Sequence, residues 1–128
     1  MTRDSPLRCL IVDDSPNFLA AARGLLEQQG VIVLGVASTG TEALAKVAQA
    51  RPDVALVDVD LGAESGFDLA ERLAVPVILI STHSGQDFAD LVAENAAVGF
   101  LSKSALSSAA VHDLLRGGED QLSATPGT

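Results

Sequence analysis

Short runs of apolar residues alternate along the chain with longer stretches in which apolar residues recur every three or four positions. A short apolar run is typical of a buried strand, whereas apolar positions three and four apart are typical of an amphipathic helix. The runs that predict strands cover residues 7–12, 31–36, 54–57, 77–80 and 98–101. Five strands that alternate with helices predict an α/β fold with a doubly wound parallel sheet.

Capping residues indicate where the first two helices begin and end. Ser15 before Pro16 fits an N-cap followed by the first helical position, and Gly30 fits the end of that helix. Thr39 and Glu42 have the spacing of a capping box, which predicts that a second helix begins there.

The second half of the chain predicts three further helices. A short helix is expected around residues 67–73, after a loop at 62–66, and a weaker one around 86–94. Ser104 is interpreted as the cap of the last helix. We therefore expect one domain over residues 1–116, followed at 117–128 by a polar tail that is frayed or forms the stub of a linker.

The composition excludes several classes of protein. Hydrophobic residues make up 48% of the chain, which argues against disorder. The net charge of −9 argues against direct DNA binding by this chain, because phosphate contacts need clustered Lys and Arg. No apolar run is long enough to span a membrane, and the first residues lack the apolar core of a signal peptide. The single cysteine, Cys9, falls in an apolar run and is expected to be a buried thiol in a cytoplasmic protein.

Polar residues follow four of the five predicted strands. Asp13 and Asp14 follow the first, Asp58 the third, Ser81 the fourth, and Lys103 comes after the fifth. Because ligands of such sheets bind at the carboxyl ends of the strands, we expect these side chains to converge. Carboxylates brought close together repel one another, and a divalent cation such as Mg²⁺ relieves that repulsion and supports phosphoryl transfer.

These residues, in this order, resemble the receiver domain of response regulators in two-component signalling. The family has an acidic pair after the first strand, a phosphoacceptor aspartate after the third, and a glycine eight residues later, here Gly66. A Ser or Thr ends its fourth strand, and a lysine lies three residues after an aromatic residue, here Phe100. The likeness covers about residues 7–116 and implies a flavodoxin-like (βα)5 fold with strand order 2-1-3-4-5.

The resemblance implies a phosphoacceptor and a metal site. Asp58 would accept the phosphoryl group from a histidine kinase, a phosphotransfer protein or a small phosphodonor. Asp14 and Asp58 would bind Mg²⁺, or Mn²⁺ in its place, through their side chains, and Asp60 through its backbone carbonyl. Asp13 would act on the metal through a water molecule.

The resemblance also implies a conformational switch. Lys103 would hold the phosphoryl oxygens, Ser81 would move toward them, and Phe100 would turn inward as Ser81 moves. The change would reach the surface of the fourth and fifth helices and the fifth strand. A downstream output protein or effector domain would recognise that surface, and phosphorylation-linked homodimers are a further expectation. The segment that ends at Ser107 is similar to receivers joined to helix-turn-helix output domains, which suggests transcription regulation.

The chain departs from the family pattern at several positions. Ser104 replaces the proline that usually follows the lysine, so the preceding peptide bond is expected to be trans or strained. Gly62 replaces a frequent proline, which predicts a more mobile loop. Asp60 and His83 occupy positions that tune the dephosphorylation rate in the family.

Two alternative functions remain open. Asp58 and Asp60 resemble the paired aspartates of haloacid-dehalogenase-type phosphatases, although that family carries the pair on its first strand. Turnover of a phosphate ester would favour that enzyme over a self-phosphorylating and self-dephosphorylating switch. The other alternative is a receiver that acts as an interaction module without phosphorylation, which the departures at Gly62 and Ser104 allow.

Overall fold

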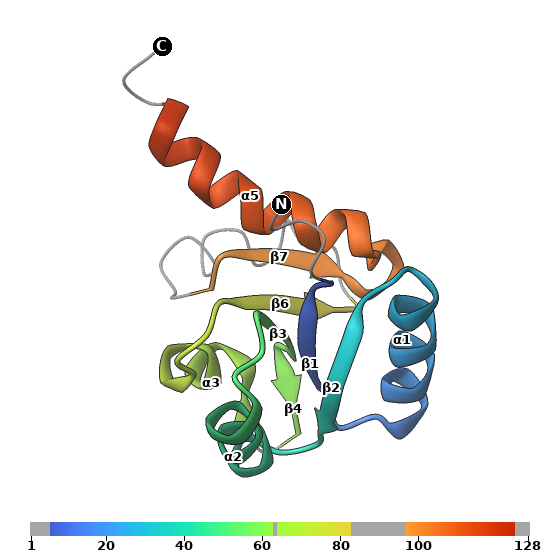
Figure 1. Cartoon of the computed structure of the whole chain (residues 1–128). Helices are drawn as coiled ribbons and strands as arrows, with labels where there is room; N and C mark the ends of the chain where they lie inside the picture. The colour runs from blue at the N-terminus through green and yellow to red at the C-terminus, as the bar shows by residue number, and fades with distance from the viewer. Residues whose placement is uncertain (1–5, 63, 83–96, 125–128) are drawn as a thin grey trace.

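The computed structural model describes residues 6–62, 64–82 and 97–124, and for residues 117–124 it describes the backbone alone. The main sheet is made of β1 (Arg8–Val12), β2 (Ile32–Ala37), β3 (Val54–Asp58), β6 (Val77–Ser81) and β7 (Gly99–Ser102). All neighbouring pairs are parallel, in the order β2-β1-β3-β6-β7 (Figure 1). Because β6 and β7 are the fourth and fifth strands of this sheet, the predicted doubly wound fold and the order 2-1-3-4-5 are confirmed.

Helices cover both faces of the sheet. They are α1 (Pro16–Gln28), α2 (Gly40–Ala50), α3 (Gly66–Arg72) and α5 (Ser108–Ala124). The core between the sheet and α1 and α5 includes Leu26 and Val111, and the core on the other face includes Val47 from α2 and Leu69 from α3. Burial on both sides explains why the central strands are continuous apolar runs rather than alternating ones.

Local capping accounts for the helix boundaries. The Ser15 hydroxyl accepts a hydrogen bond from the N–H of Phe18, which fixes the start of α1, and Gly30 has the positive φ of 90° that lets the chain leave it. The Thr39 hydroxyl caps α2 in the same way. The expected reciprocal bond of the capping box reaches one residue further back, since Glu42 accepts from the N–H of Ser38.

The segment after Asp58 differs from the prediction of a plain loop. β4 (Asp60–Leu61) and β5 (Glu64–Ser65) form a small antiparallel hairpin. The Asp60 carboxylate accepts a hydrogen bond from the N–H of Gly62, whose φ of 72° allows the tight turn. This hydrogen bond joins Asp60 of β4 to the first residue of the turn.

The end of the chain also differs from the prediction. Ser104 does not cap the last helix but lies in a short 3₁₀ helix, η3 (Lys103–Ala105). The helix α5 begins at Ser108, where the Ser107 hydroxyl accepts from the N–H of Ala110. The backbone of α5 continues as a helix to Ala124, beyond residue 116, where the expected domain ends (Figure 1).

Some expectations fall on parts of the chain that the structure leaves out. The weaker helix predicted at 86–94 and His83 lie outside the described residues. In the described part no peptide bond is cis, so the bond before Ser104 is trans. Among the same residues, no helix has both the length and the apolar character that a membrane span requires.

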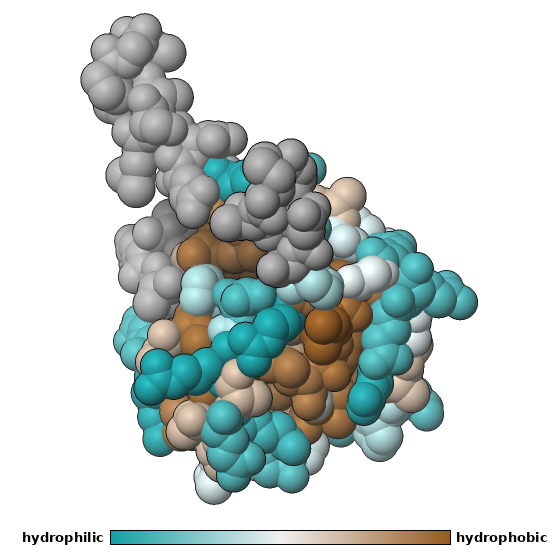
Figure 2. Space-filling model, viewed as in Figure 1, coloured by the Kyte–Doolittle hydropathy of each residue, from teal (hydrophilic) through white to brown (hydrophobic). Residues whose placement is uncertain are grey.

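The edge of the sheet at β2 is the most apolar part of one face of the molecule. Figure 2 shows hydrophobic residues gathered over β1 and β2, between α1 and α2. Ile32, on the edge strand, remains 44% exposed. The polar residues described next follow the carboxyl ends of the strands.

Candidate functional site

Three carboxylates from two strands meet at one edge of the sheet. Asp13 and Asp14 follow β1, and Asp58 is the last residue of β3, its neighbour in the sheet. One oxygen from each carboxylate lies within 4.8 Å of the other two. Asp13 is fully buried and Asp58 is 7% exposed, whereas Asp14 is exposed. The convergence expected from the strand ends is therefore present.

The ammonium group of Lys103 completes this cluster. Its Nζ lies 2.6 Å from Oδ2 of Asp13 and 3.2 Å from Oδ2 of Asp58. Lys103 is the first residue of η3, directly after β7, and its side chain is 16% exposed. One cation thus faces two largely buried carboxylates across the edge of the sheet.

Backbone hydrogen bonds orient both buried carboxylates toward the lysine. Oδ1 of Asp13 accepts from the N–H of Ser15 at 2.8 Å, and Oδ1 of Asp58 accepts from the N–H of Asp60 at 3.0 Å. The Oδ2 atoms are left to face Lys103. Oδ2 of Asp13 is fully buried and is compensated by the short ion pair with the Lys103 ammonium.

The charges in this cluster shift each other's protonation. Burial raises the pKa of Asp58, and the neighbouring Asp13 carboxylate adds to that rise, against the lowering by the Asp60 N–H and by Lys103. Burial alone would lower the pKa of Lys103, but its contacts with the two carboxylates outweigh this and raise it. Lys103 therefore stays charged, and negative charge on Asp58 is costly unless further positive charge arrives.

The cluster opens into a cleft of about 580 Å³. Ser81 at the end of β6 is 2% exposed and lines this cleft together with Thr82. The hairpin after Asp58 forms another wall, in which Asp60 and Gly62 take part. Every predicted catalytic or metal-binding residue except Asp13 lines the cleft, and Asp13 lies behind it against Lys103.

The predicted switch residue Phe100 lies on β7, next to β6. It pairs with Leu79 in the register of the two strands, and Ser81 pairs with Ser102 two residues later. Phe100 is half-buried and packs against the core on the side of α2 and α3. Phe100 therefore lies two residues before the strand position that pairs with Ser81. A movement of Ser81 would have to be transmitted over this offset to reach the Phe100 ring.

Three residues outside the predicted set of site residues also contribute to the site. Glu64 on β5 accepts a hydrogen bond at 2.7 Å from the N–H of Gly40, which ties the hairpin to the start of α2. Gly66 lies so close to the backbone of Asp58 that a Cβ there would overlap its carbonyl oxygen. Phe18, in the first turn of α1, faces the Lys103 ammonium with its ring. The glycine spacing was a signal for Gly66, whereas Glu64 and Phe18 had none.

The donor set fits a divalent cation that prefers oxygen ligands. Asp13, Asp14 and Asp58 offer carboxylate oxygens from adjacent elements, and the raised pKa of Asp58 reflects negative charge that lacks full compensation. Mg²⁺ is bound in proteins by one or two carboxylates with several waters, which suits an exposed Asp14 beside a buried Asp58. The carboxylate of Asp60 lies outside this cluster and accepts from Gly62 instead.

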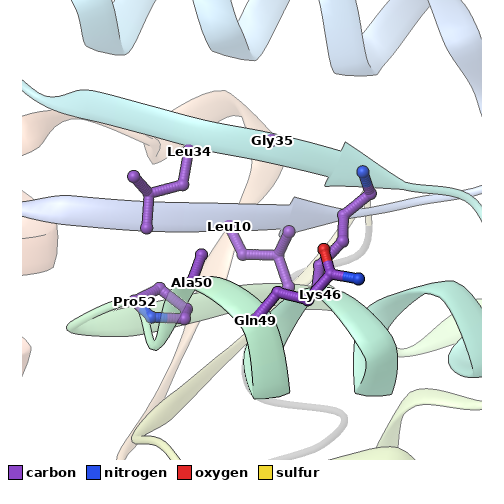
Figure 3. Close-up of a pocket in the computed structure, with 7 residues that line it drawn as sticks. All are labelled: Leu10, Leu34, Gly35, Lys46, Gln49, Ala50 and Pro52. Carbon is purple, nitrogen blue, oxygen red and sulfur yellow. The ribbon is translucent and has the colours of Figure 1, made fainter.

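A second cavity lies on another part of the sheet and is too small for a comparable role. It measures about 90 Å³ and is lined by residues of β1, β2 and α2 and by Pro52 (Figure 3). The side chain of Lys46 reaches from α2 toward β2, and its Cδ lies 3.4 Å from where a Cβ of Gly35 would be. The missing side chain of Gly35 thus explains the gap, which the lysine stem partly covers.

Comparison with known proteins gives a consistent result. A family model of the response regulator receiver domain matches residues 9–115. The chain is 38% identical over 96 residues to protein-glutamate methylesterase/protein-glutamine glutaminase 5 of Myxococcus xanthus, covering 68% of this chain and 26% of that protein. It is 28% identical over 102 residues to the DNA-binding transcriptional activator EvgA of Escherichia coli, covering 76% and 50%.

Solved structures extend the likeness over nearly the whole chain. The signal receiver domain of a modulated diguanylate cyclase from Desulfovibrio desulfuricans G20 superposes with a TM-score of 0.74 and 31% identity, covering 93% of this chain and 99% of that one. The curated relatives are longer, and the chain spans from 22% to 50% of the length of several of them.

Proposed function

Because the chain belongs to the response regulator receiver domain family, we propose that it is a signalling switch that accepts a phosphoryl group on Asp58. A receiver of this kind changes its surface in response to phosphorylation and passes the signal to a partner. The role of each residue is carried over from the family resemblance, and the geometry of the site supports it.

One observation carries the proposal, namely the joint position of the acidic cluster and the lysine. Asp58 lies in a cleft, within 4.8 Å of the two carboxylates after β1 and 3.2 Å from the ammonium of Lys103. A carboxylate in this setting can act as a nucleophile toward phosphorus, because the nearby cation neutralises charge that develops on the phosphoryl oxygens.

The transfer can be written with Asp58 as the only residue that changes its covalent bonds. A carboxylate oxygen of Asp58 forms a bond to phosphorus while the bond between phosphorus and the donor's leaving group breaks, and the electron pair stays with the leaving group. Lys103 then binds phosphoryl oxygens in place of the carboxylate oxygen that it now contacts. The donor would be a phosphohistidine of a kinase or phosphotransfer protein, or a small acyl phosphate.

Asp14 and Asp58 would bind Mg²⁺, or Mn²⁺, through their side chains and Asp60 through its backbone carbonyl, with Asp13 acting through water. When bound, the ion neutralises charge on the carboxylates and on the phosphoryl oxygens.

Ser81 and Phe100 would carry the signal away from the site. Ser81 lines the same cleft as Asp58, and its hydroxyl would move toward a phosphoryl group on Asp58. Phe100 lies on the adjacent strand and would follow Ser81 inward, which shifts the balance between two packings of β7 and its surroundings. β7 and α5 would present this change to a partner.

The output is proposed from the relatives. EvgA, named as a DNA-binding transcriptional activator, is about twice as long as the stretch it shares with this chain. We infer that this receiver regulates transcription in the cytoplasm through an output domain or a separate protein. Phosphorylation-linked homodimers are the form in which such an output would act.

The two alternatives are less well supported. A haloacid-dehalogenase-type phosphatase would carry its nucleophile on the first strand, whereas Asp58 ends the third strand of the sheet. A receiver that works without phosphorylation has no need of a lysine beside three converging carboxylates, which this chain has.

Intact mass spectrometry tests the proposal directly. Incubation with acetyl phosphate and Mg²⁺ should add one phosphoryl group, and chelation of the metal should greatly reduce the addition. Asp58→Ala should take up none, whereas Asp60→Ala should still be labelled because its carboxylate lies outside the cluster.

Labelling that persists in Asp58→Ala would contradict the assignment of the phosphoacceptor. Steady release of phosphate from a generic ester would favour the phosphatase. A wild-type protein that folds and binds Mg²⁺ but takes up no phosphoryl group would favour the interaction module.

A further inference from the structure

The ammonium of Lys103 rests against an aromatic face as well as against carboxylates. Its Nζ lies 4.3 Å from the centroid of the Phe18 ring. Phe18 belongs to the first turn of α1, is half-buried, and packs against the core beneath that helix. A cation this close to a ring face is attracted by the negative charge of the π system, and more strongly where water is partly excluded, as it is here.

Asp13 and the Phe18 ring are linked through one residue. The N–H of Ser15 donates to Oδ1 of Asp13, and the hydroxyl of Ser15 accepts from the N–H of Phe18. Both groups that flank Lys103 are therefore fixed by the same capped turn of α1. In the sequence this turn is explained by N-capping alone. In the structure, the position of the turn also sets where the Lys103 ammonium can lie.

The ring differs from the other partners of Lys103 because it carries no net charge. The two carboxylates compete with any incoming anion for the ammonium, and Asp58 must exchange this contact when it receives a phosphoryl group. The ring neither neutralises the ammonium nor has a directional hydrogen bond to break. Lys103 can therefore pivot over it from carboxylate to phosphoryl oxygen without leaving the cleft.

We propose that Phe18 is a positioning residue for phosphoryl acceptance, whose ring face holds the Lys103 ammonium at the cleft while its anionic partners change. This inference rests on the proposed function of Asp58. It assigns Phe18 a role in the rate of phosphorylation, through Lys103, that a residue serving only to fill the core would not have.

Substitutions at Phe18 separate the effect of the aromatic ring from the effect of side-chain size. The rate of phosphorylation by acetyl phosphate with Mg²⁺ should fall by about three- to tenfold in Phe18→Leu and stay within about twofold of wild type in Phe18→Tyr. Ala22→Gly loosens α1 at a buried position away from Lys103 and should keep the wild-type rate in the folded protein. A wild-type rate in Phe18→Leu would overturn the proposal.

Fluorinated phenylalanines at position 18 provide a second test at nearly constant size. Each added fluorine withdraws charge from the ring face, so the logarithm of the rate should fall stepwise with the number of fluorines. In NMR spectra, the Cε protons of Lys103 should be shifted upfield by the ring, and Phe18→Leu should abolish this shift. Equal rates across the series would overturn the proposal.

The two measurements also separate this proposal from the one on which it rests. If the wild-type protein takes up no phosphoryl group, the function of Asp58 fails irrespective of Phe18. If it is phosphorylated but Lys103 shows no ring-induced shift, Phe18 does not hold the ammonium and only the further inference fails.

Discussion

At the scale of single residues, Lys103 decides whether the acidic edge of the sheet is stable. Its ammonium separates a fully buried Asp13 from Asp58, whose side chain is 10% exposed. Removing one charged group of a buried ion pair leaves its partner as an uncompensated buried charge. The resulting loss of stability exceeds what the intact pair contributes. The same residue is thus required by the fold and available to the chemistry.

Lys103→Met should lower the free energy of unfolding by about 3 kcal/mol near neutral pH. The pKa of Asp58 is already raised by burial, and it rises further when the lysine, which lowers it, is removed. A carboxyl group whose pKa is raised in the fold disfavours the fold when charged, so the loss should shrink as the pH falls and the group takes up a proton.

Urea denaturation at about pH 7 and about pH 5 measures this difference. Lys46→Met, which removes a half-buried lysine away from the cluster, is the matched control and should show no such pH dependence. An equal loss at both pH values would argue against carboxylate repulsion as the cause.

Cys9 illustrates a residue whose burial makes it inert. It is 1% exposed on β1, and burial raises the pKa of its thiol to about 12. We expect no alkylation by iodoacetamide near pH 8 in the folded protein, and one adduct in urea, as followed by mass. Because the unfolded thiol ionises near its ordinary pKa of 9.0, stability should decline as the pH rises from there toward 12. Rapid alkylation of the folded protein would contradict this.

At the scale of elements, the strand ends were predictable and the segments between them less so. Asp13 and Asp58 could be brought together from the sequence because parallel strands place their carboxyl ends at one edge. The hairpin of β4 and β5 could not, since two-residue strands are too short to show a periodicity. Ser104 and Ser107 are both acceptable caps, and the choice between them depends on the packing of η3, which a local pattern does not contain.

Contacts between distant elements could not be predicted from the sequence, because a local pattern does not show which elements pack together. Phe18 has the spacing of a core residue of α1, and nothing in that spacing indicates which side chain its ring will face. The Glu64 contact with the start of α2 likewise depends on how the hairpin folds back. Helix propensity was also misleading for α5. The glycines after residue 116 predicted that the helix ends there, but its backbone stays helical to Ala124.

Two glycines in helices should respond to alanine in opposite directions. Gly66 begins α3 against the carbonyl of Asp58, so Gly66→Ala forces these segments apart and should cost about 2–3 kcal/mol. Gly24, within α1, has no atom within 4 Å of an added Cβ, so Gly24→Ala should stabilise the protein by about 0.5–1 kcal/mol. Urea midpoints measure both. A neutral Gly66→Ala would show that α3 is not anchored on β3.

At the scale of the whole molecule, the fold concentrates uncompensated negative charge where it would bind a cation. The chain carries a net charge of −9, and three of its carboxylates meet at one edge with a single ammonium among them. The acidic edge therefore weakens the domain unless another cation arrives. In this arrangement, the carboxylates proposed to serve phosphoryl acceptance also make the stability of the domain depend on a bound cation.

Mg²⁺ should for that reason stabilise the whole domain by mass action. At a concentration about ten times its dissociation constant, a ligand that binds only the folded state adds about 1.4 kcal/mol, or about 5 °C in the melting temperature of a domain this size. NaCl at matched ionic strength should give little of this shift, because screening alone is weak for partly buried charges. Asp14→Asn removes an exposed member of the cluster, so the variant should fold, melt slightly higher without metal, and lose most of the response to Mg²⁺. If Asp14→Asn responded like the wild type, the cation would be binding elsewhere and the acidic edge would not be the metal site.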